Sequence, residues 1–429
     1  MSKENSNNRK KKSGFKPGVL LIIVVVLLAA VIAGLFFTRK EEEEEDLRAV
    51  LAEPQIEESI TVGATGDMLI HTPIITAVDT GYGYDFSGCF DLVAPYYQEP
   101  DLMIANLEVT CGGEEAGSYR GYPTFNCPDS LIPTLKEAGV DICLTANNHS
   151  YDTGFDGMLR TLELLDENGI EHLGTRSDED EHFIMVKKVG DIKLGMVCFT
   201  YDTRDSTSWD KSLNGIVMDE GAVNLVNSFC YPELDELYDN VEKAMDEMNM
   251  LGVDSKIVFS HWGNEYTDEP NDYEYEIAQE ICELGADVII GGHPHVIQKY
   301  DTLTSSNGHQ TLCLYSMGNE LSNQRAELMD EDGNRGYTED GLIFEVTYSK
   351  FNNGNVKITG LEILPTWVEK YDGAYTIVPC DAEKDPSSWG AAYTEAAMNS
   401  YERTQGRVSE AYNEFRKSKK QDPVPESLY

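Results

Sequence analysis

The clearest potential for chemistry lies in two histidines, His293 and His295, within the sequence GGHPH at 291–295. An apolar run at 286–290 precedes them and predicts a buried strand. The two glycines allow a sharp turn and leave room for a ligand to approach. Pro294 fixes the chain between the imidazoles, so that their placement costs little further entropy. A His-x-His pair in a loop is also often an ordinary polar turn, and the pattern alone leaves both interpretations open.

Four other apolar, strand-like runs end in polar residues of the same kinds. They end in Gly66-Asp67, in Asn106-Leu107-Glu108, in Asn147-Asn148-His149 followed by Asp152, and in His261 followed by Glu265. In an open α/β sheet, ligands bind at the carboxyl ends of the strands. Carboxylate, amide and imidazole groups that converge there suit a hard or borderline cation. Five such strand ends in chain order therefore predict a metal or anion site.

The elements that would position these residues alternate along the chain. Helical spacing is found at 130–138, 155–168, 234–250 and 273–284, and β-hairpins are predicted at 183–200 and 341–365. A further strand at 312–315 ends at Ser316-Met317-Gly318-Asn319, which places Ser316 and Asn319 near the rim of the site. Strands that alternate with helices favour an α/β layered domain with mixed sheets.

The first forty residues differ from the rest of the chain. Residues 19–37 carry no charge and are long enough to span a bilayer, and five basic residues between Arg9 and Lys16 precede them. The positive-inside rule then places the N-terminus in the cytoplasm and the rest of the chain outside. Cleavage after Ala33 is an alternative, but the apolar run continues past it and favours an uncleaved signal anchor.

We therefore predict five segments. They are a cytoplasmic basic tail at 1–18, a transmembrane signal anchor at 19–37, an acidic spacer at 38–59, a main domain at 60–370, and a C-terminal helical appendage and tail at 371–429.

The charge is strongly acidic outside the N-terminal segment. Eight of the 33 basic and one of the 76 acidic residues lie in residues 1–40, which leaves 25 basic and 75 acidic residues beyond them. Such a surface repels nucleic acid and anionic lipid, so neither is expected as a partner. The plainest reason for the charge is solubility, or adaptation to a cation-rich cell wall.

The nine cysteines are too few and too scattered for a disulfide framework, and no Cys-x-x-Cys spacing suggests a zinc ribbon. Cys111 and Cys127 flank a glycine-rich loop and would pair only in an oxidising compartment. The sequence leaves their state open.

The combined motifs resemble the CapA (PgsA) family of membrane-anchored proteins of bacterial poly-γ-glutamate capsule synthesis. The resemblance rests on the strand-end residues named above and covers roughly residues 60–320. The family is in turn similar to the calcineurin-like metallophosphoesterases. The resemblance therefore implies a four-layer α/β/β/α sandwich with up to two metal ions at the strand ends.

The resemblance also implies roles for individual residues. Metal ligands would be Asp67, Glu108, Asn148, His261, His293 and His295; Asn148 and His149 would be catalytic; and Asn106, Asn147, Asp152, Glu265, Ser316 and Asn319 would support the site or form its rim. Neutral imidazoles favour Mn, Fe or Zn over Ca or Mg. Trp262 is interpreted as a packing residue.

Two departures from the phosphoesterase pattern matter. Leu69 stands where that pattern has a histidine, with His71 a weak substitute, and Asn106 stands where it has a bridging aspartate. An amide bridges two cations poorly because it does not offset their repulsion. Glu108, two residues further on the same face of the strand, could take over that role; otherwise the site holds one metal ion, or an anion without metal.

Two classes of function follow from the resemblance. The first is a metal-dependent, phosphoesterase-like hydrolase of capsule or cell-envelope metabolism, outside the cytoplasm and anchored by one membrane span. The second is a non-catalytic accessory subunit that binds or guides the polymer among the polyglutamate synthesis and export subunits. Retention of His149 and His293 favours the first class, whereas the altered first two motifs favour the second.

Overall fold

The computed structural model describes residues 54–204, 209–329 and 336–421, and residues 25, 28, 31, 32, 34–36, 39 and 40 nearer the N-terminus. The latter are helical, and within the described part of the chain no helix combines the length and apolarity that a bilayer span requires. Much of the predicted anchor at 19–37 lies outside the described residues. Contacts divide the chain into Met1–Gln55 and Ile56–Tyr429, and both sheets belong to the second unit.

The first sheet has the strand order β17-β16-β15-β1-β2-β3-β4, with β14 beside β1. Its parallel strands are β1 (Ile56–Met68), β2 (Leu102–Asn106), β3 (Ile142–Leu144), β4 (Glu171–Leu173) and the short β14 (Asn319–Leu321). Its antiparallel strands are β15 (Asp340–Phe351), β16 (Val356–Tyr371) and β17 (Ala374–Pro379). The sheet is therefore mixed, as predicted.

The second sheet has the order β12-β13-β11-β10-β6-β5, with β9 beside β6. Its parallel strands are β6 (Ile192–Tyr201), β9 (Ser228–Phe229), β10 (Ser255–His261), β11 (Val288–Gly292) and β13 (Gln310–Leu314). Its antiparallel edges are β5 (Met185–Val189) and β12 (Tyr300–Thr304). A separate small hairpin joins β7 (Ser212–Leu213) to β8 (Ile216–Val217).

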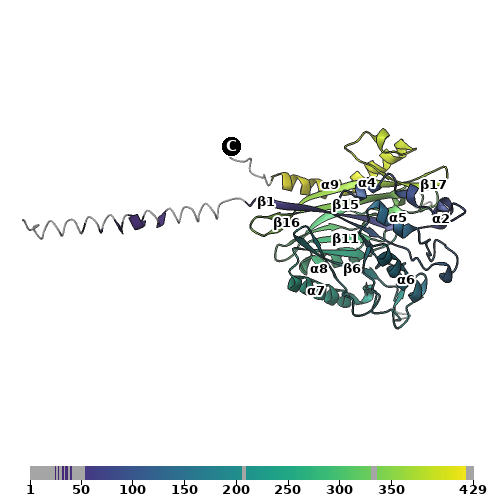
Figure 1. Cartoon of the computed structure of the whole chain (residues 1–429), viewed down its shortest axis with the longest axis horizontal. Helices are drawn as coiled ribbons and strands as arrows, with labels where there is room; N and C mark the ends of the chain where they lie inside the picture. Colours follow the sequence, from purple (N-terminus) through teal and green to yellow (C-terminus); the bar gives the residue numbers. More distant parts are fainter. Residues whose placement is uncertain are drawn as a thin grey trace, which may run out of the picture. The chain divides into compact units, whose positions relative to one another are not determined.

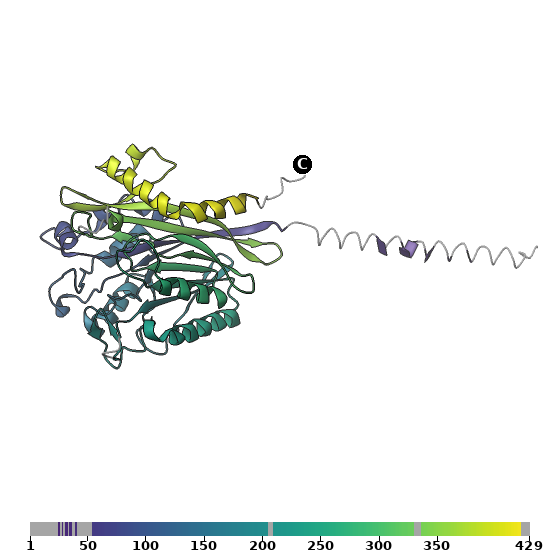
Figure 2. The same cartoon turned by 180° about the vertical axis from the view of Figure 1, so that it is seen from behind.

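Helices cover the outer face of each sheet (Figures 1 and 2). Against the first sheet lie α2 (Thr72–Val78), α3 (Ser87–Phe90), α4 (Ala94–Tyr97), α5 (Leu131–Ala138) and α6 (Gly154–Glu167). Against the second lie α7 (Leu234–Leu251) and α8 (Asp272–Glu283). Short 3-10 turns occur at Glu114–Ala116, Tyr231–Glu233, Tyr337–Glu339 and Pro386–Ser388. The sequence analysis identified α5 to α8 but did not resolve α2, α3 and α4.

Three apolar clusters fix the order of the layers. Because side chains alternate along a strand, β2 sends Ile104 into the core between the sheets and Met103 into the core beneath the helices. In the same way β11 sends Ile290 inward and Ile289 toward α7 and α8. The layers are thus helices, sheet, sheet and helices, and the expectation of a mixed α/β fold is confirmed.

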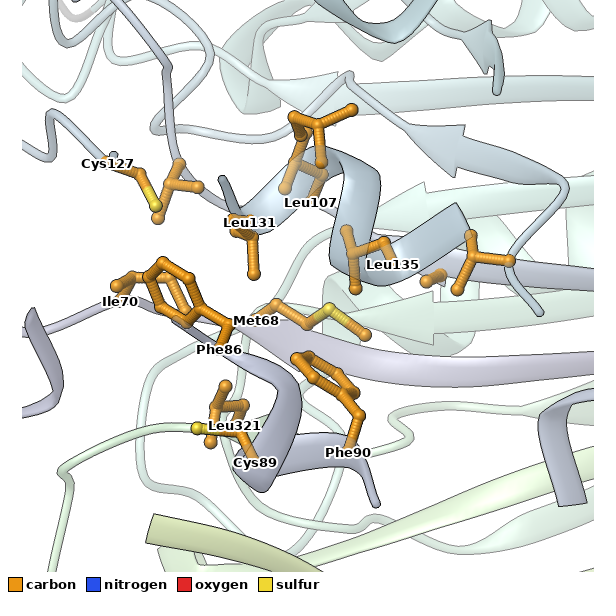
Figure 3. Close-up of a cluster of buried hydrophobic side chains, with 14 of the residues drawn as sticks. Met68, Ile70, Phe86, Cys89, Phe90, Leu107, Cys127, Leu131, Leu135 and Leu321 are labelled. Atoms are coloured by element: carbon orange, nitrogen blue, oxygen red, sulfur yellow. The ribbon is translucent and has the colours of Figure 1, made fainter. Parts of the chain in front are cut away.

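The outer core of the first sheet shows how the chain segments meet. Figure 3 shows Met68 of β1 beside Phe86 and Phe90 at α3, with Leu131 and Leu135 of α5 across from them. All five side chains are at most 2% exposed. Burying a side chain of this size contributes roughly 1.5–3 kcal/mol, so this cluster anchors the end of β1, where Asp67 lies.

The C-terminal helix α9 (Thr394–Gln421) packs on β16 and β12. Its Val408 and Tyr412 join the core between the sheets, and its Arg403 forms an ion pair with the buried Asp340 of β15. Both β17 and α9 lie beyond the predicted domain end at 370, so the packed unit continues past that residue.

All nine cysteines are buried and carry free thiols. These include Cys111 and Cys127, whose pairing the sequence left open. Burial raises the pKa of the Cys127 thiol well above its ordinary value, with Cys111 beside it as a further cause.

Candidate metal site

The carboxyl ends of parallel strands from both sheets meet at one place. Asp67 at the end of β1 is the register partner of Asn106 at the end of β2. His261 at the end of β10 is likewise the partner of Gly292 at the end of β11. The two pairs belong to different sheets, and Asp67 contacts the chain just after Gly292. The candidate site therefore lies between the sheets.

The end of β11 can reach this place because it carries glycines. A Cβ atom on Gly291 would lie 1.9 Å from the backbone oxygen of Tyr315, and one on Gly292 would lie 2.8 Å from Asp67 Oδ1. The histidines that follow have positive φ angles, 97° at His293 and 58° at His295. Non-glycine residues in this region of φ cost free energy and cluster at functional sites.

Asp67 is the hydrogen-bonding centre of the site. Its Oδ1 accepts from Asn106 Nδ2 at 2.7 Å, and its Oδ2 accepts from the His293 backbone N–H at 3.1 Å and from His295 Nδ1 at 3.0 Å. Burial acts to raise the pKa of this carboxyl group, but the hydrogen bond and charge of His295, with smaller effects of His261 and Asn106, lower it overall. Asp67 is therefore an anion that holds the other groups in place.

Glu108 is buried in a different way. The residue is 0% exposed, and neither carboxylate oxygen has a hydrogen-bond partner among the described residues. His261 Nε2 lies 3.3 Å from Glu108 Oε1, which is within ion-pair range, but this nitrogen bonds to Asn148 Oδ1 at 2.8 Å. Burial, and then the charge of Asp67, raise the pKa of Glu108 well above its ordinary value. An unpartnered buried carboxylate is costly unless something else binds it.

These residues fit a metal ion. Two groups of residues each bring their possible ligand atoms within 4.8 Å of one another. One group consists of Glu108, His293 and His295, and the other of Asp67, Glu108 and His261. Glu108 belongs to both groups, which suits a bridging ligand. His293 Nδ1 is also buried without a partner. Burial lowers the pKa of His261 to about 3 and that of His293 well below its ordinary value, so both imidazoles are neutral, as ligation requires.

His295 differs from the other two imidazoles. Burial alone would lower its pKa, but the carboxylates of Glu108 and Asp67 raise it to about 9. His295 is therefore protonated, and its Nδ1 donates to the Asp67 carboxylate. Replacing its proton by a divalent metal ion would add one positive charge, which would balance two carboxylates at Asp67 and Glu108.

His149 stands at the edge of the cluster in its own hydrogen-bond network. Its Nδ1 donates to Asp152 Oδ2 at 2.7 Å, and the ring of Phe125 meets it edge-on with centroids 4.7 Å apart. Asp152 also accepts from the Phe125 backbone N–H at 2.6 Å and from Asn214 Nδ2 at 3.0 Å. Because Nδ1 is engaged, Nε2 is the nitrogen that remains for a substrate.

Two residues that support the site were not identified from the sequence. Asn214, in the turn of the β7–β8 hairpin, donates to Pro123 O at 2.8 Å as well as to Asp152. The Asn-Gly pair at 214–215 does signal a tight hairpin turn, but not its target. Tyr201, at the end of β6, lies parallel to His261 within 4° and 4.8 Å from the His293 ring. A tyrosine at a strand end carries no comparable signal.

The other predicted supporting residues lie at varying distances from the ligand groups. Asn147 Nδ2 donates to Asn106 Oδ1 at 3.2 Å, which links the second and third strand ends. Glu265 is exposed, with Oε1 at 3.9 Å from His295 Nε2. Ser316 and Asn319 are both buried and make hydrogen bonds within residues 316–338, to Gly318 N and to Gln324 and Thr338 O respectively.

Trp262 and His71 are both largely buried, but neither belongs to a ligand group. Trp262 is fully buried, and its Nε1 donates to Tyr315 O at 2.9 Å, so it is a packing residue as predicted. His71 packs edge-on against Phe125, and burial lowers its pKa to about 4. The two ligand groups do not include His71.

Comparison with known proteins places this geometry in a family context. The model of the family "Bacterial capsule synthesis protein PGA_cap" matches residues 61–324. The Capsule biosynthesis protein CapA of Bacillus anthracis is 26% identical over 271 residues, which is 62% of this chain and 61% of that protein. The PGA biosynthesis protein CapA of Bacillus subtilis is 25% identical over 279 residues, 64% of each chain.

A more distant relative carries a different description. A probable polyglutamine synthesis accessory protein of Mycobacterium tuberculosis is 24% identical over 209 residues, which is 47% of this chain and 52% of that protein. The chain thus spans less than two thirds of the length of these relatives. The matched segment, residues 61–324, contains every residue of the two ligand groups.

Proposed function

The chain belongs to the family of bacterial capsule synthesis proteins, and from that premise we propose that it acts in poly-γ-glutamate capsule synthesis as a membrane-anchored, extracytoplasmic protein with a metallophosphoesterase-like site. The names of the Bacillus relatives support the capsule role. The uncharged run at 19–37 and its basic flank support the anchor and the orientation.

One observation carries the proposed site. Glu108, buried and without a hydrogen-bond partner, is common to two groups of ligand atoms that also contain Asp67 and three histidines. A divalent ion bound there would supply a polarised water and a Lewis acid for a phosphoryl oxygen. We assign its binding to Asp67, Glu108, Asn148 and the imidazoles of His261, His293 and His295. These nitrogen ligands suit Mn, Fe or Zn.

The chain's own residues would then act on the substrate around that ion. Asp152 holds His149 through Nδ1, so His149 Nε2 is oriented to hold or donate a proton where charge develops. Asn147 and Asn106 connect the strand ends by hydrogen bonds and keep Asp67 in position. The buried surroundings strengthen each of these electrostatic interactions.

A second candidate is a non-catalytic accessory subunit that binds or guides the polymer together with the synthesis and export subunits. It is favoured by Asn106, an amide engaged by Asp67 and Asn147 where the phosphoesterase pattern has a bridging carboxylate. The description of the mycobacterial relative as an accessory protein points the same way.

Replacing His149 by alanine distinguishes the two candidates. We expect His149→Ala to abolish cell-surface polymer, and any phosphoesterase turnover, while it lowers the free energy of unfolding by no more than about 2 kcal/mol. Capsule staining of cells and thermal unfolding of the purified chain measure the two effects. His182→Ala, at a side chain 79% exposed, is the matched control. A folded His149→Ala variant with full polymer output would remove the enzymatic candidate in favour of the accessory one.

A further inference from the structure

Three basic side chains gather at one cavity in this otherwise acidic protein. A cavity of about 380 Å³ on the outer side of the second sheet is lined by Arg176, Lys211 and Lys243, by the amides of Asn224, Asn227 and Asn240, and by the rings of Phe183 and Phe199. The chain as a whole has a formal net charge of −43. Three cationic side chains around one cavity are therefore unexpected in a protein with this net negative charge.

Two of these cations are held in place by neutral groups. Arg176 Nη1 donates to Asn227 Oδ1 at 2.5 Å, and Arg176 Nη2 donates to Asn224 O. Lys211 Nζ donates to Val223 O at 2.8 Å and Val226 O at 3.4 Å. These bonds leave N–H groups of both side chains unused, since a guanidinium has five donors and an ammonium three.

Carboxylates do not neutralise these cations by direct contact. Among the described residues, no carboxylate oxygen lies within 4.0 Å of a charged nitrogen of Arg176, Lys211 or Lys243. Glu236 also lines the cavity, but it pairs with Arg204 at 3.3 Å.

The acids whose charges act on Lys211 and Arg176 have other partners. Asp202 is buried and pairs with Arg204 at 2.9 Å. Glu179 accepts from Asn224 Nδ2 at 2.9 Å, and Glu181 accepts from Ser177. These acids act on Lys211 and Arg176 from beyond ion-pair range and oppose the effect of burial only in part. An anion bound in direct contact would offset more of the cost of burying the two cations.

The electrostatics agree with this geometry. Burial lowers the pKa of Lys211, and the charges of Arg204 and Arg176 lower it further against the opposing effect of Asp202 and Glu236. Burial likewise lowers the pKa of Arg176. Both cations thus lie in a place that partly excludes water, and Glu179 and Glu181 oppose the effect of burial on Arg176.

We propose that the cavity between Arg176, Lys211 and Lys243 is a binding site for a small oxyanion, either a carboxylate or a phosphate, separate from the candidate metal cluster. Guanidinium and ammonium groups that point at one volume form charge-assisted hydrogen bonds with such an anion. The proposal rests on this cavity alone and does not depend on the function proposed for the metal cluster.

Titration of the purified full chain tests the proposal. Sodium glutarate and sodium phosphate are titrated separately by calorimetry, at constant ionic strength set with chloride and with a chelator present to keep metal ions out of the cluster. We expect saturable binding of one anion per chain. The tighter of the two probes identifies the source as carboxylate or phosphate, and saturable binding of neither would overturn the proposal.

Variants then locate the site. Arg176→Met and Lys211→Met keep an apolar stem and remove the charge, and each is expected to weaken binding by about tenfold or more. Lys243→Ala, at an exposed position where folding is not at risk, is expected to weaken binding by about threefold. Lys188→Met removes an exposed lysine paired with Asp191 and is the control. If both Lys243→Ala and a folded Arg176→Met variant bound the anion as tightly as the wild type, the assignment of the site would be overturned.

Discussion

At the scale of single residues, the candidate site is defined by how three buried histidines differ. His261 and His293 are neutral because burial lowers their pKa values, whereas His295 is held as a cation by Glu108 and Asp67. The protonation state of a buried histidine therefore depends on its neighbours. Glu108 is the residue that most needs a further ligand, since neither of its buried carboxylate oxygens has a hydrogen-bond partner among the described residues.

Loss of two imidazoles should remove the metal. We expect the double variant His293→Ala, His295→Ala to lose its bound divalent ion. Loss of a residue that only hydrogen-bonds to a metal ligand lowers metal affinity roughly 10- to 100-fold, and loss of two ligands should lower it further. Elemental analysis of the purified chain measures the metal content. His182→Ala, whose side chain is exposed, should keep its metal. Unchanged stoichiometry in the double variant would show that the cluster binds no metal through these residues.

At the scale of elements, the start of α8 depends on a buried acid. Asn271 Oδ1 accepts from Glu274 N at 3.0 Å and Glu274 Oε2 accepts from Asn271 N at 2.8 Å, which forms a capping box. Glu274 Oε1 and Gln298 Oε1 both lack a partner. Burial raises the pKa of Glu274 to about 7, although Asn271 and Gln298 lower it in part.

This acid gives a pH dependence with a definite sign. Since its folded pKa is raised, Glu274 contributes stability below about pH 4.5, and that contribution is lost as the pH rises through 7. Glu274→Gln keeps an acceptor for Asn271 N and adds a donor for Gln298. Between pH 5 and pH 8, the free energy of unfolding of the wild type should therefore fall by on the order of 2 kcal/mol relative to that of the variant.

Denaturant unfolding of both proteins at pH 5 and pH 8 measures this difference. The variant Glu276→Gln, on the same helix, is the control because no hydrogen bond ties Glu276 to the cap. A stability difference between wild type and Glu274→Gln that is equal at both pH values would contradict the prediction.

Gly291, near the end of β11, gives a second prediction at this scale. Gly291→Ala places a methyl group 1.9 Å from the Tyr315 backbone oxygen, so β11 and β13 must separate. We expect a loss of about 3 kcal/mol or more in the free energy of unfolding, since overpacking of a close backbone contact is among the costly substitutions. Thermal unfolding measures it. Gly88→Ala has open space around its new methyl group and should change stability by less than about 1 kcal/mol.

At the scale of the whole molecule, the candidate metal site is assembled from residues of two sheets that pack against each other. The first sheet supplies Asp67 and Glu108, and the second supplies His261, His293 and His295. Each ligand group combines at least one carboxylate from the first sheet with at least one imidazole from the second, so neither sheet supplies a complete group. Sheet packing and the site are therefore coupled, and we expect bound metal to stabilise the fold against unfolding.

Membrane topology is the prediction that belongs to the entire chain. The uncharged run at 19–37 with basic residues before it predicts that residues 41–429 lie outside the cytoplasm. Protease added to intact cells, after removal of the outer wall, should degrade the large domain and spare an epitope fused at the N-terminus. A domain protected until the cells are lysed would reverse the predicted orientation.

The sequence by itself determined the strands and what stands at their ends. Apolar runs flanked by glycines are local signals, so the runs that lead to Asp67, Asn106, His261 and His293 are β1, β2, β10 and β11 with only small shifts of their bounds. The helices α5 to α8 were found for the same reason, because their spacing and terminal glycines are local. The short α2, α3 and α4 lack a full period and were not resolved.

Only the tertiary structure decided which strand ends meet. Strand order and sheet packing depend on contacts between residues far apart in the chain, such as that of Asp67 with His295. Three features were therefore not predictable from the sequence. They are the sharing of Glu108 by both ligand groups, the hydrogen bond from Asn214 to Asp152, and the cationic cavity around Arg176 and Lys211. A local pattern specifies an element and the face of each side chain, whereas a pKa or a ligand group depends on neighbours that folding brings from elsewhere.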